Sequence, residues 1–243
     1  MKSLAALAAL ALAIGLALPA QAQAEETGVS VSEPVVVELF TSQGCSSCPP
    51  ADALLEQLAG RRDVLALALH VDYWDYIGWK DIFASPDYTQ RQKGYAHAAG
   101  RKMIYTPQMV VMGQKDILGG DAMALSDAIA VQHGTARPVA LQVQRRGDEL
   151  SLSVSAREGL PDHPVAIYVL RYTPMKTVDI TRGELAGRRI DYANIVEDLR
   201  QVATWDGQAA AVFTVPYAKG LPGAVLVQNA PYGAVLAAAG IAQ

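Results

Sequence analysis

The sequence predicts a layered α/β domain followed by a mostly β, sandwich-like domain. Residues 35–134 alternate short apolar runs with stretches of helical periodicity, and this alternation is typical of α/β domains. Residues 138–243 instead alternate apolar with polar residues, as strands with one buried face do. The change falls near Gly134–Pro138. We therefore expect two domains, over residues 35–134 and 138–243.

The first half contains strand and helix signals in the order β-α-β-α-β-β-α. Val35–Phe40 is a Val-rich run and predicts a buried strand. Pro49–Ala59 predicts a helix, because its leucines fall on one face and Gly60 follows to end it. The remaining elements are a strand, a helix capped by a serine, a pair of strands and a closing helix, at Val64–Val71, Ser85–Ala99, Pro107–Met112, Lys115–Leu118 and Asp121–Gln132.

The second half begins with a predicted β-hairpin. Residues 139–143 and 150–154 alternate apolar with polar side chains, and Gly147-Asp148 lies between them. Tyr192–Val202 is the one stretch here that predicts a helix, since its apolar residues fall on one side. Further strands are predicted at Val165–Leu170, Ala211–Val215, Ala224–Gln228 and Ala234–Ala239.

The first 24 residues predict a signal peptide. Lys2 supplies a positive start, Leu4–Leu18 is an apolar stretch, and small-x-small sites allow cleavage after Ala22 or Ala24. An uncleaved membrane anchor is the alternative, but the stretch is shorter than the ~20 residues that a spanning helix needs. Residues 25–34 predict a flexible entry segment. We expect a periplasmic or secreted protein with no stable membrane insertion after cleavage.

The charge balance argues against two kinds of partner. The chain has a formal net charge of −4 and contains no basic run. Nucleic acids and anionic membrane surfaces attract clustered positive charge. Neither is therefore an expected partner.

The two cysteines of the chain form a Cys-x-x-Cys pair between a predicted strand and a predicted helix. They are Cys45 and Cys48. This layout is typical of redox sites, because the start of a helix stabilises a thiolate. We expect Cys45 to attack a substrate and Cys48 to resolve the mixed disulfide. Outside the cytoplasm the pair can also persist as a disulfide.

The strand, the Cys-x-x-Cys-Pro segment, the helix after it and the later Tyr105-Thr106-Pro107 resemble the thioredoxin superfamily. The resemblance implies that Pro107 follows a cis bond and, with Thr106, binds extended substrate backbone beside the cysteines. An ordinary proline at the start of a strand is the alternative. The resemblance also implies a proton-relaying buried acid on the first strand, where Glu38 lies. Alternatively, Glu38 points outward from an edge strand.

A closer resemblance is to a family of secreted bacterial thioredoxin-like proteins of uncharacterised function with a β-rich C-terminal half. Residues 38–52 match its signature without a gap, and three shorter motifs extend the match over nearly the whole mature chain: His70–Trp74, Tyr105–Gln108 and Tyr192–Asn194. The family implies a fold but no agreed reaction.

The segment from His70 to Asp81 is rich in aromatic residues. Because it follows a predicted strand, it is expected near the ligand crevice of an α/β sheet. One interpretation is a substrate-binding wall that includes His70, Asp72 and Trp74. The other is a loop packed onto the β domain, with His70 as a structural residue.

The leading hypothesis is a thiol–disulfide oxidoreductase that acts on protein thiols or disulfides, or on a redox partner protein, without a cofactor. A binding module with a redox-inert disulfide is one alternative. A copper-assembly factor that uses Cys45, Cys48 and His70 is another, since thiolates suit Cu(I). The cysteine spacing is one residue shorter than in such proteins, and their histidine normally lies much later. A metal is therefore not expected.

Overall fold

The computed structural model describes residues 27–28, 33–157, 164–218 and 220–242. The predicted signal peptide and most of the predicted entry segment lie outside these residues. Among the described residues, no helix combines the length and the apolar character that crossing a membrane requires.

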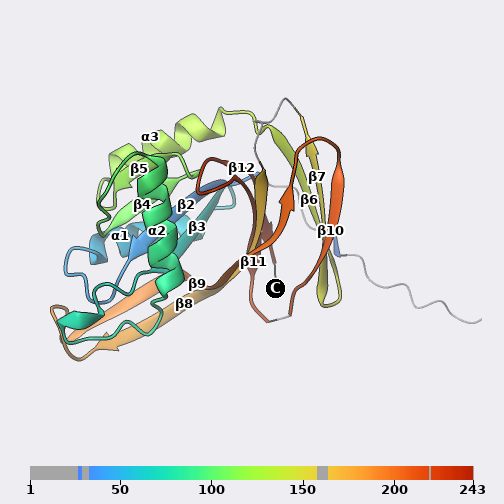
Figure 1. Ribbon diagram of the computed structural model, residues 1–243. Coiled ribbons are helices and arrows are strands. Elements are labelled where there is room, and N and C mark those ends of the chain that lie inside the picture. Colours follow the sequence, from blue (N-terminus) through green and yellow to red (C-terminus); the bar gives the residue numbers. More distant parts are fainter. Residues whose placement is uncertain (1–26, 29–32, 158–163, 219, 243) are drawn as a thin grey trace, which may run out of the picture.

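The fold is built on one eight-stranded mixed sheet (Figure 1). Its strand order is β12-β11-β8-β9-β3-β2-β4-β5. In chain order these strands are β2 Val35–Thr41, β3 Val64–His70, β4 Gln108–Val111, β5 Lys115–Leu118, β8 Val165–Ile180, β9 Arg188–Trp205, β11 Gly223–Asn229 and β12 Val235–Ile241.

The predicted fold class is wrong, because strands from the second half complete the sheet begun by the first. β9 lies beside β3 in parallel, with Ala68 opposite Ile195. Strands account for 45% of the structure and helices for 19%, so the protein is mostly β. It is not a helix-rich α/β thioredoxin-like fold followed by a β domain. The physical reason is the edge of β3, whose seven residues are all buried and whose backbone groups need partners.

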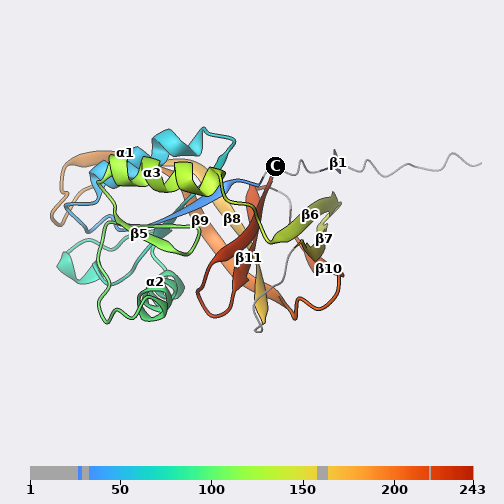
Figure 2. The same cartoon turned by 90° about the horizontal axis from the view of Figure 1, so that it is seen from above.

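Three helices cover the central part of this sheet from both sides (Figure 2). Helices α1 (Pro49–Ala59) and α3 (Ala122–His133) lie on one face, and α2 (Pro86–Ala98) lies on the other. A short 3₁₀ turn, η1 (Asp75–Ile77), precedes α2. The helices begin where the sequence predicts. α1 opens on two prolines, and the Ser85 side chain accepts a hydrogen bond from the Asp87 N–H to cap α2.

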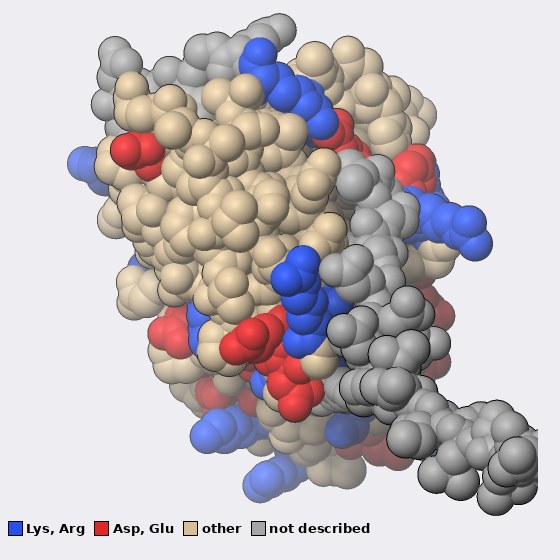
Figure 3. Space-filling view, turned by 90° about the vertical axis from the view of Figure 1, so that its right-hand side faces the viewer, with Lys and Arg blue, Asp and Glu red and all other residues tan. Residues whose placement is uncertain are grey.

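A second, four-stranded antiparallel sheet packs on the β8–β11–β12 side. Its order is β1-β6-β7-β10, with β1 at Thr27–Gly28, β6 at Val139–Arg146, β7 at Glu149–Ala156 and β10 at Ala211–Pro216. The predicted hairpin is confirmed in β6 and β7. Apolar residues from both sheets form one buried cluster between them. Figure 3 shows the broad uncharged surface at this end of the molecule, and the outward-facing side chains of the sheet include Gln142, Gln144, Ser151, Ser153, Val212 and Thr214.

The predicted helix at Tyr192–Val202 is wrong, since this segment lies within β9. Strand β9 pairs with β8, but the register shifts twice, so Glu197 and Val202 have no opposite residue. Each shift inserts one residue and resets the alternation of buried and exposed side chains. Two resets within six residues make the apolar spacing look helical, and the sequence pattern alone does not separate the two cases.

Candidate functional site

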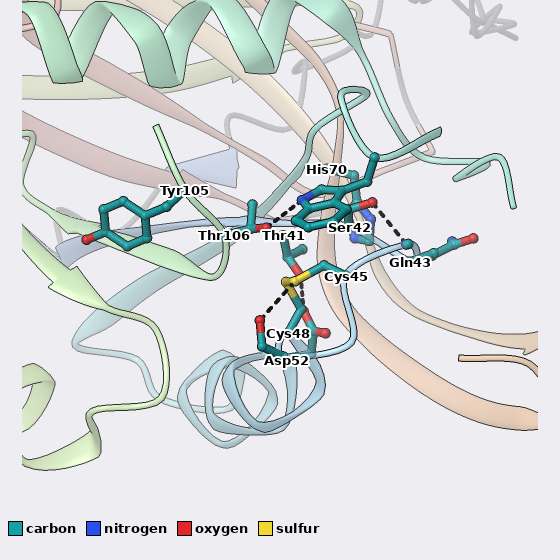
Figure 4. Close-up of a disulfide and its surroundings, with 12 residues drawn as sticks. Thr41, Ser42, Gln43, Cys45, Cys48, Asp52, His70, Tyr105 and Thr106 are labelled. Carbon is teal, nitrogen blue, oxygen red and sulfur yellow. Dashed lines mark hydrogen bonds between the residues drawn. A yellow bond between two sulfur atoms is a disulfide. The ribbon is translucent and has the colours of Figure 1, made fainter. Parts of the chain in front are cut away.

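The two cysteines form a disulfide at the start of α1 (Figure 4). Their Cα atoms are 5.4 Å apart, and Cys48 is the N-cap residue of the helix. The loop that follows β2 places them there, with the Cys48 N–H donating to the Cys45 carbonyl. Both cysteines are buried, with exposed fractions of 1% for Cys45 and 0% for Cys48. The intervening serines are exposed.

The segment before β4 lies beside the disulfide. The expected cis bond between Thr106 and Pro107 is confirmed. A Cβ atom added to Gly119 would lie 2.6 Å from the Pro107 Cβ and 3.0 Å from the Ala51 Cβ. Pro107 therefore lies against the first turn of α1, near the cysteines. Figure 4 shows Thr106, the residue before Pro107, near the disulfide.

Trp74 bridges the two sides of the site. Its indole Nε1–H donates to the Thr106 hydroxyl at 2.7 Å. Its Cβ packs so closely on the cysteine loop that a Cβ on Gly44 would come within 3.0 Å of it. Trp74 thus spans from the residue before Cys45 to the residue before Pro107. This position helps explain why the sulfur atoms are buried.

Asp52 is the residue that sequence reasoning missed. It lies one helical turn after Cys48, is only 4% exposed, and accepts a 2.7 Å hydrogen bond from the Thr41 hydroxyl. Its second carboxylate oxygen has no hydrogen-bond partner among the described residues. Burial raises the pKa of Asp52 to about 7, while the nearby His70 partly offsets this effect. A carboxyl group with a pKa near neutrality can accept and release a proton.

His70 lies behind this carboxyl group. It ends β3 directly opposite Thr41 in the sheet register. Its Nδ1 is 2.7 Å from the Asp81 carboxylate, and both side chains are fully buried. The same Asp81 oxygen accepts the Gln43 N–H at 2.8 Å, so this pair also holds the cysteine loop. The His70 ring packs edge-on against Phe83 and Tyr192.

The predicted substrate wall divides into three separate environments. Trp74 is partly exposed beside the disulfide, and His70 is buried behind the cysteine loop. Asp72 turns toward α2, where it accepts a 2.6 Å hydrogen bond from the Thr89 hydroxyl. Of the three, only Trp74 is both partly exposed and in contact with Thr106.

Glu38 is fully buried, so it does not point outward from an edge strand. It forms an ion pair with Arg91 of α2 at 2.6 Å and accepts a hydrogen bond from the Tyr95 hydroxyl. Arg91 also donates to the Gln228 side chain of β11 at 3.1 Å. These contacts fully occupy Glu38 on the α2 side of the sheet, and none of them involves a cysteine.

The described residues contain no cluster of three or more His, Cys, Asp or Glu side chains with the spacing of a metal site. The Nδ1 atom of His70 is engaged by Asp81.

The fold and the site together define a mixed-sheet protein with a buried disulfide at the first turn of a helix. Residues 36–228 match the model of a family described as a protein of unknown function, DUF1223. The chain belongs to this family. The predicted resemblance to an uncharacterised family is consistent with this result.

Two solved structures are similar to this chain. A crystal structure of an Agrobacterium tumefaciens protein shares 34% identity and a TM-score of 0.73, over 87% of this chain and 95% of that one. The structure of HBP35 from Porphyromonas gingivalis shares 16% identity and a TM-score of 0.59, over 87% and 76% of the two chains. At that identity the second likeness concerns the fold alone. No curated protein matched the sequence.

Proposed function

We propose that this protein is an exported thiol–disulfide oxidoreductase that acts through Cys45 and Cys48. The observation that carries the proposal is the grouping of three features around one helix start: the disulfide, the Thr106-Pro107 segment and the buried Asp52. A helix start favours a thiolate at the cysteines. Asp52 offers a proton acceptor one turn away from Cys48.

In the reduced protein the Cys45 thiolate attacks one sulfur of a substrate disulfide. A bond forms between that sulfur and Cys45 Sγ, the substrate disulfide breaks, and one substrate thiolate leaves. Cys48 then transfers its proton to Asp52 and attacks Cys45 Sγ. The Cys45–Cys48 disulfide forms, and the second substrate thiolate leaves. This sequence reduces the substrate disulfide at the expense of the protein dithiol. The reverse sequence oxidises a substrate dithiol to a disulfide and returns Cys45 and Cys48 to thiols.

The resemblance to the thioredoxin superfamily supports this proposal at the site rather than in the whole fold. By that resemblance, Thr106 and Pro107 hold extended substrate backbone beside the cysteines. The indole of Trp74 is bonded to Thr106, so a substrate takes the place of this contact when it binds. We assign the proton-accepting role to Asp52 in place of Glu38, since Arg91 neutralises Glu38.

A binding module with a structural disulfide is the second candidate, and the burial of both sulfur atoms favours it. An inert disulfide over so short a loop contributes little to stability in the chain-entropy model, because the stabilisation grows with loop length. Stability therefore gives no reason for this pair to exist, whereas exchange chemistry does.

A trapping experiment tests the proposed function. In a Cys48→Ser variant, a substrate bound to Cys45 cannot be released, so mixed disulfides accumulate with model peptide disulfides and are counted by intact mass. The matched Cys45→Ser variant is expected to form few adducts, because the proposal assigns the attack on substrate to Cys45 and only the resolving step to Cys48. If the two variants form adducts equally, or if neither forms any, the assignment of Cys45 as the attacking cysteine is contradicted.

A further inference from the structure

A buried cluster of polar side chains lies behind the disulfide, and several of its atoms are unsatisfied. Three of these are the second carboxylate oxygen of Asp52, the Nε2 atom of His70 and the hydroxyl of Tyr192, none of which has a hydrogen-bond partner among the described residues. All three residues are at most 4% exposed. Unpaired polar groups at this depth are costly to leave without a partner, so such groups usually have a function or hold water.

The side chains that carry the three unsatisfied atoms lie in one buried region, which Thr41 links. The His70 and Tyr192 rings have centroids 5.0 Å apart. Asp52 interacts electrostatically with both His70 and Tyr192. Thr41 joins the group, because its hydroxyl binds Asp52 and its backbone lies opposite His70 in the sheet. Buried waters typically make about three hydrogen bonds to groups of this kind.

We propose that Asp52, His70 and Asp81 form a buried proton relay, with a water molecule joining the Asp52 carboxyl group to the Nε2 atom of His70. The inference rests on the proposed function, since the proton that enters the relay comes from the Cys48 thiol. Asp52 accepts that proton and passes it through the water to His70. The Asp81 carboxylate, 2.7 Å from Nδ1, stabilises the imidazolium that results.

The relay explains why two fully buried groups, His70 and Asp81, accompany a disulfide. His70 is a positioning residue, because it acts on the reaction through Asp52. The ionisable groups that face Asp52 are Cys48 at the start of α1, His70 of β3, Asp81 after η1 and Tyr192 of β9. Of these, His70 lowers the pKa of Asp52 and Asp81 raises it.

The test follows the two thiolate release steps when the reduced protein meets 5,5′-dithiobis(2-nitrobenzoic acid) in a stopped-flow instrument. The first release of thionitrobenzoate reports attack by Cys45, and the second reports resolution by Cys48. The rate of the second step is measured from pH 5 to pH 9 in wild-type protein, His70→Gln, Asp81→Asn and the exposed control His133→Gln. Circular dichroism confirms that each variant is folded, and the isosteric Asp81→Asn carries the test where His70→Gln does not fold.

The relay predicts that the maximal rate of the second step falls about tenfold in His70→Gln and in Asp81→Asn, which is less than the loss of a direct acid–base group costs. The midpoint of the pH profile should rise in His70→Gln and fall in Asp81→Asn, because the two residues shift the pKa of Asp52 in opposite directions. The control should match wild type.

Three results overturn the relay. If the midpoints move while the maximal rates stay at the wild-type value, His70 affects the pKa of Asp52 but does not transfer a proton. Maximal rates that fall while the midpoints stay fixed indicate a purely structural role. A wild-type protein that shows no second step refutes the proposed function itself, and the relay falls with it.

Discussion

Asp52 and Glu38 are both buried carboxyl groups, and their partners assign them different roles. Glu38 faces the Arg91 guanidinium at 2.6 Å. The Asp52 carboxyl group instead accepts from the Thr41 hydroxyl, and its second oxygen has no hydrogen-bond partner in the part of the chain that the structure describes. The sequence offered a reason to choose Glu38, since it lies on a strand among apolar residues. Asp52 lies in the first turn of α1, where the helix dipole stabilises acidic residues in general, so its position in the sequence does not distinguish it. Its burial beside β2 and β3 is a tertiary effect that spacing does not reveal.

The raised pKa of Asp52 predicts a stability change with pH. The folded protein holds a proton on Asp52 up to about pH 7, whereas in the unfolded chain this proton is lost near the ordinary value of 3.8. Unfolding therefore releases a proton between these values, and stability falls as the pH rises through this window. Asp52→Asn removes the effect. Urea unfolding of the oxidised protein should show this variant gaining up to about 4 kcal/mol at pH 8 relative to its difference from wild type at pH 4.

The matched control for this prediction is Asp127→Asn on the exposed surface of α3. Its free energy of unfolding should follow the wild-type curve at both pH values. An Asp52→Asn variant whose stability keeps a constant offset from wild type would show that the pKa of Asp52 is the same in the folded and the unfolded protein.

Among the elements, the loop after β3 controls how solvent and substrate reach the disulfide, because it carries Trp74. The sequence predicted an aromatic segment near the cysteines, and Trp74 confirms part of that prediction. It did not predict that the indole would cover the site, because the bond to Thr106 joins residues 32 positions apart. Strand β9 illustrates a different difficulty. Its two bulges interrupt the alternation of apolar and polar residues that identifies a strand. The spacing of apolar residues that remains resembles that of a helix.

The contact between Trp74 and Thr106 predicts how fast the disulfide reacts. Trp74→Phe keeps a ring over the site but removes the hydrogen bond, whose net value is about 0.5–1.5 kcal/mol. The disulfide should then be exposed more often, and its reduction by dithiothreitol should accelerate roughly two- to tenfold. Trp205→Phe serves as the control, since it removes a similar bond, to the Ala209 carbonyl, in the other core. Equal rates in both variants would mean that Trp74 does not govern access.

At the scale of the whole molecule, the sequence did not predict that strands from both halves of the chain form one sheet. The helices and most strands lie where the sequence predicts, because their signals are local. Pairing β9 with β3 depends on contacts between residues more than 120 positions apart. The Glu38–Arg91–Gln228 network adds a second link, since it joins β2, α2 and β11 in one buried set of contacts. The disulfide at the start of α1 therefore lies on a frame that both halves of the chain build.

The central claim is that this frame holds a disulfide that exchanges with partners, and its reduction potential tests the claim most directly. Purified protein is equilibrated in glutathione buffers, and the free thiols at Cys45 and Cys48 are counted by mass spectrometry. A potential between roughly −120 and −270 mV, the range of disulfide oxidoreductases, is the predicted result. A potential below about −300 mV, as structural disulfides have, would contradict the account and favour the binding module.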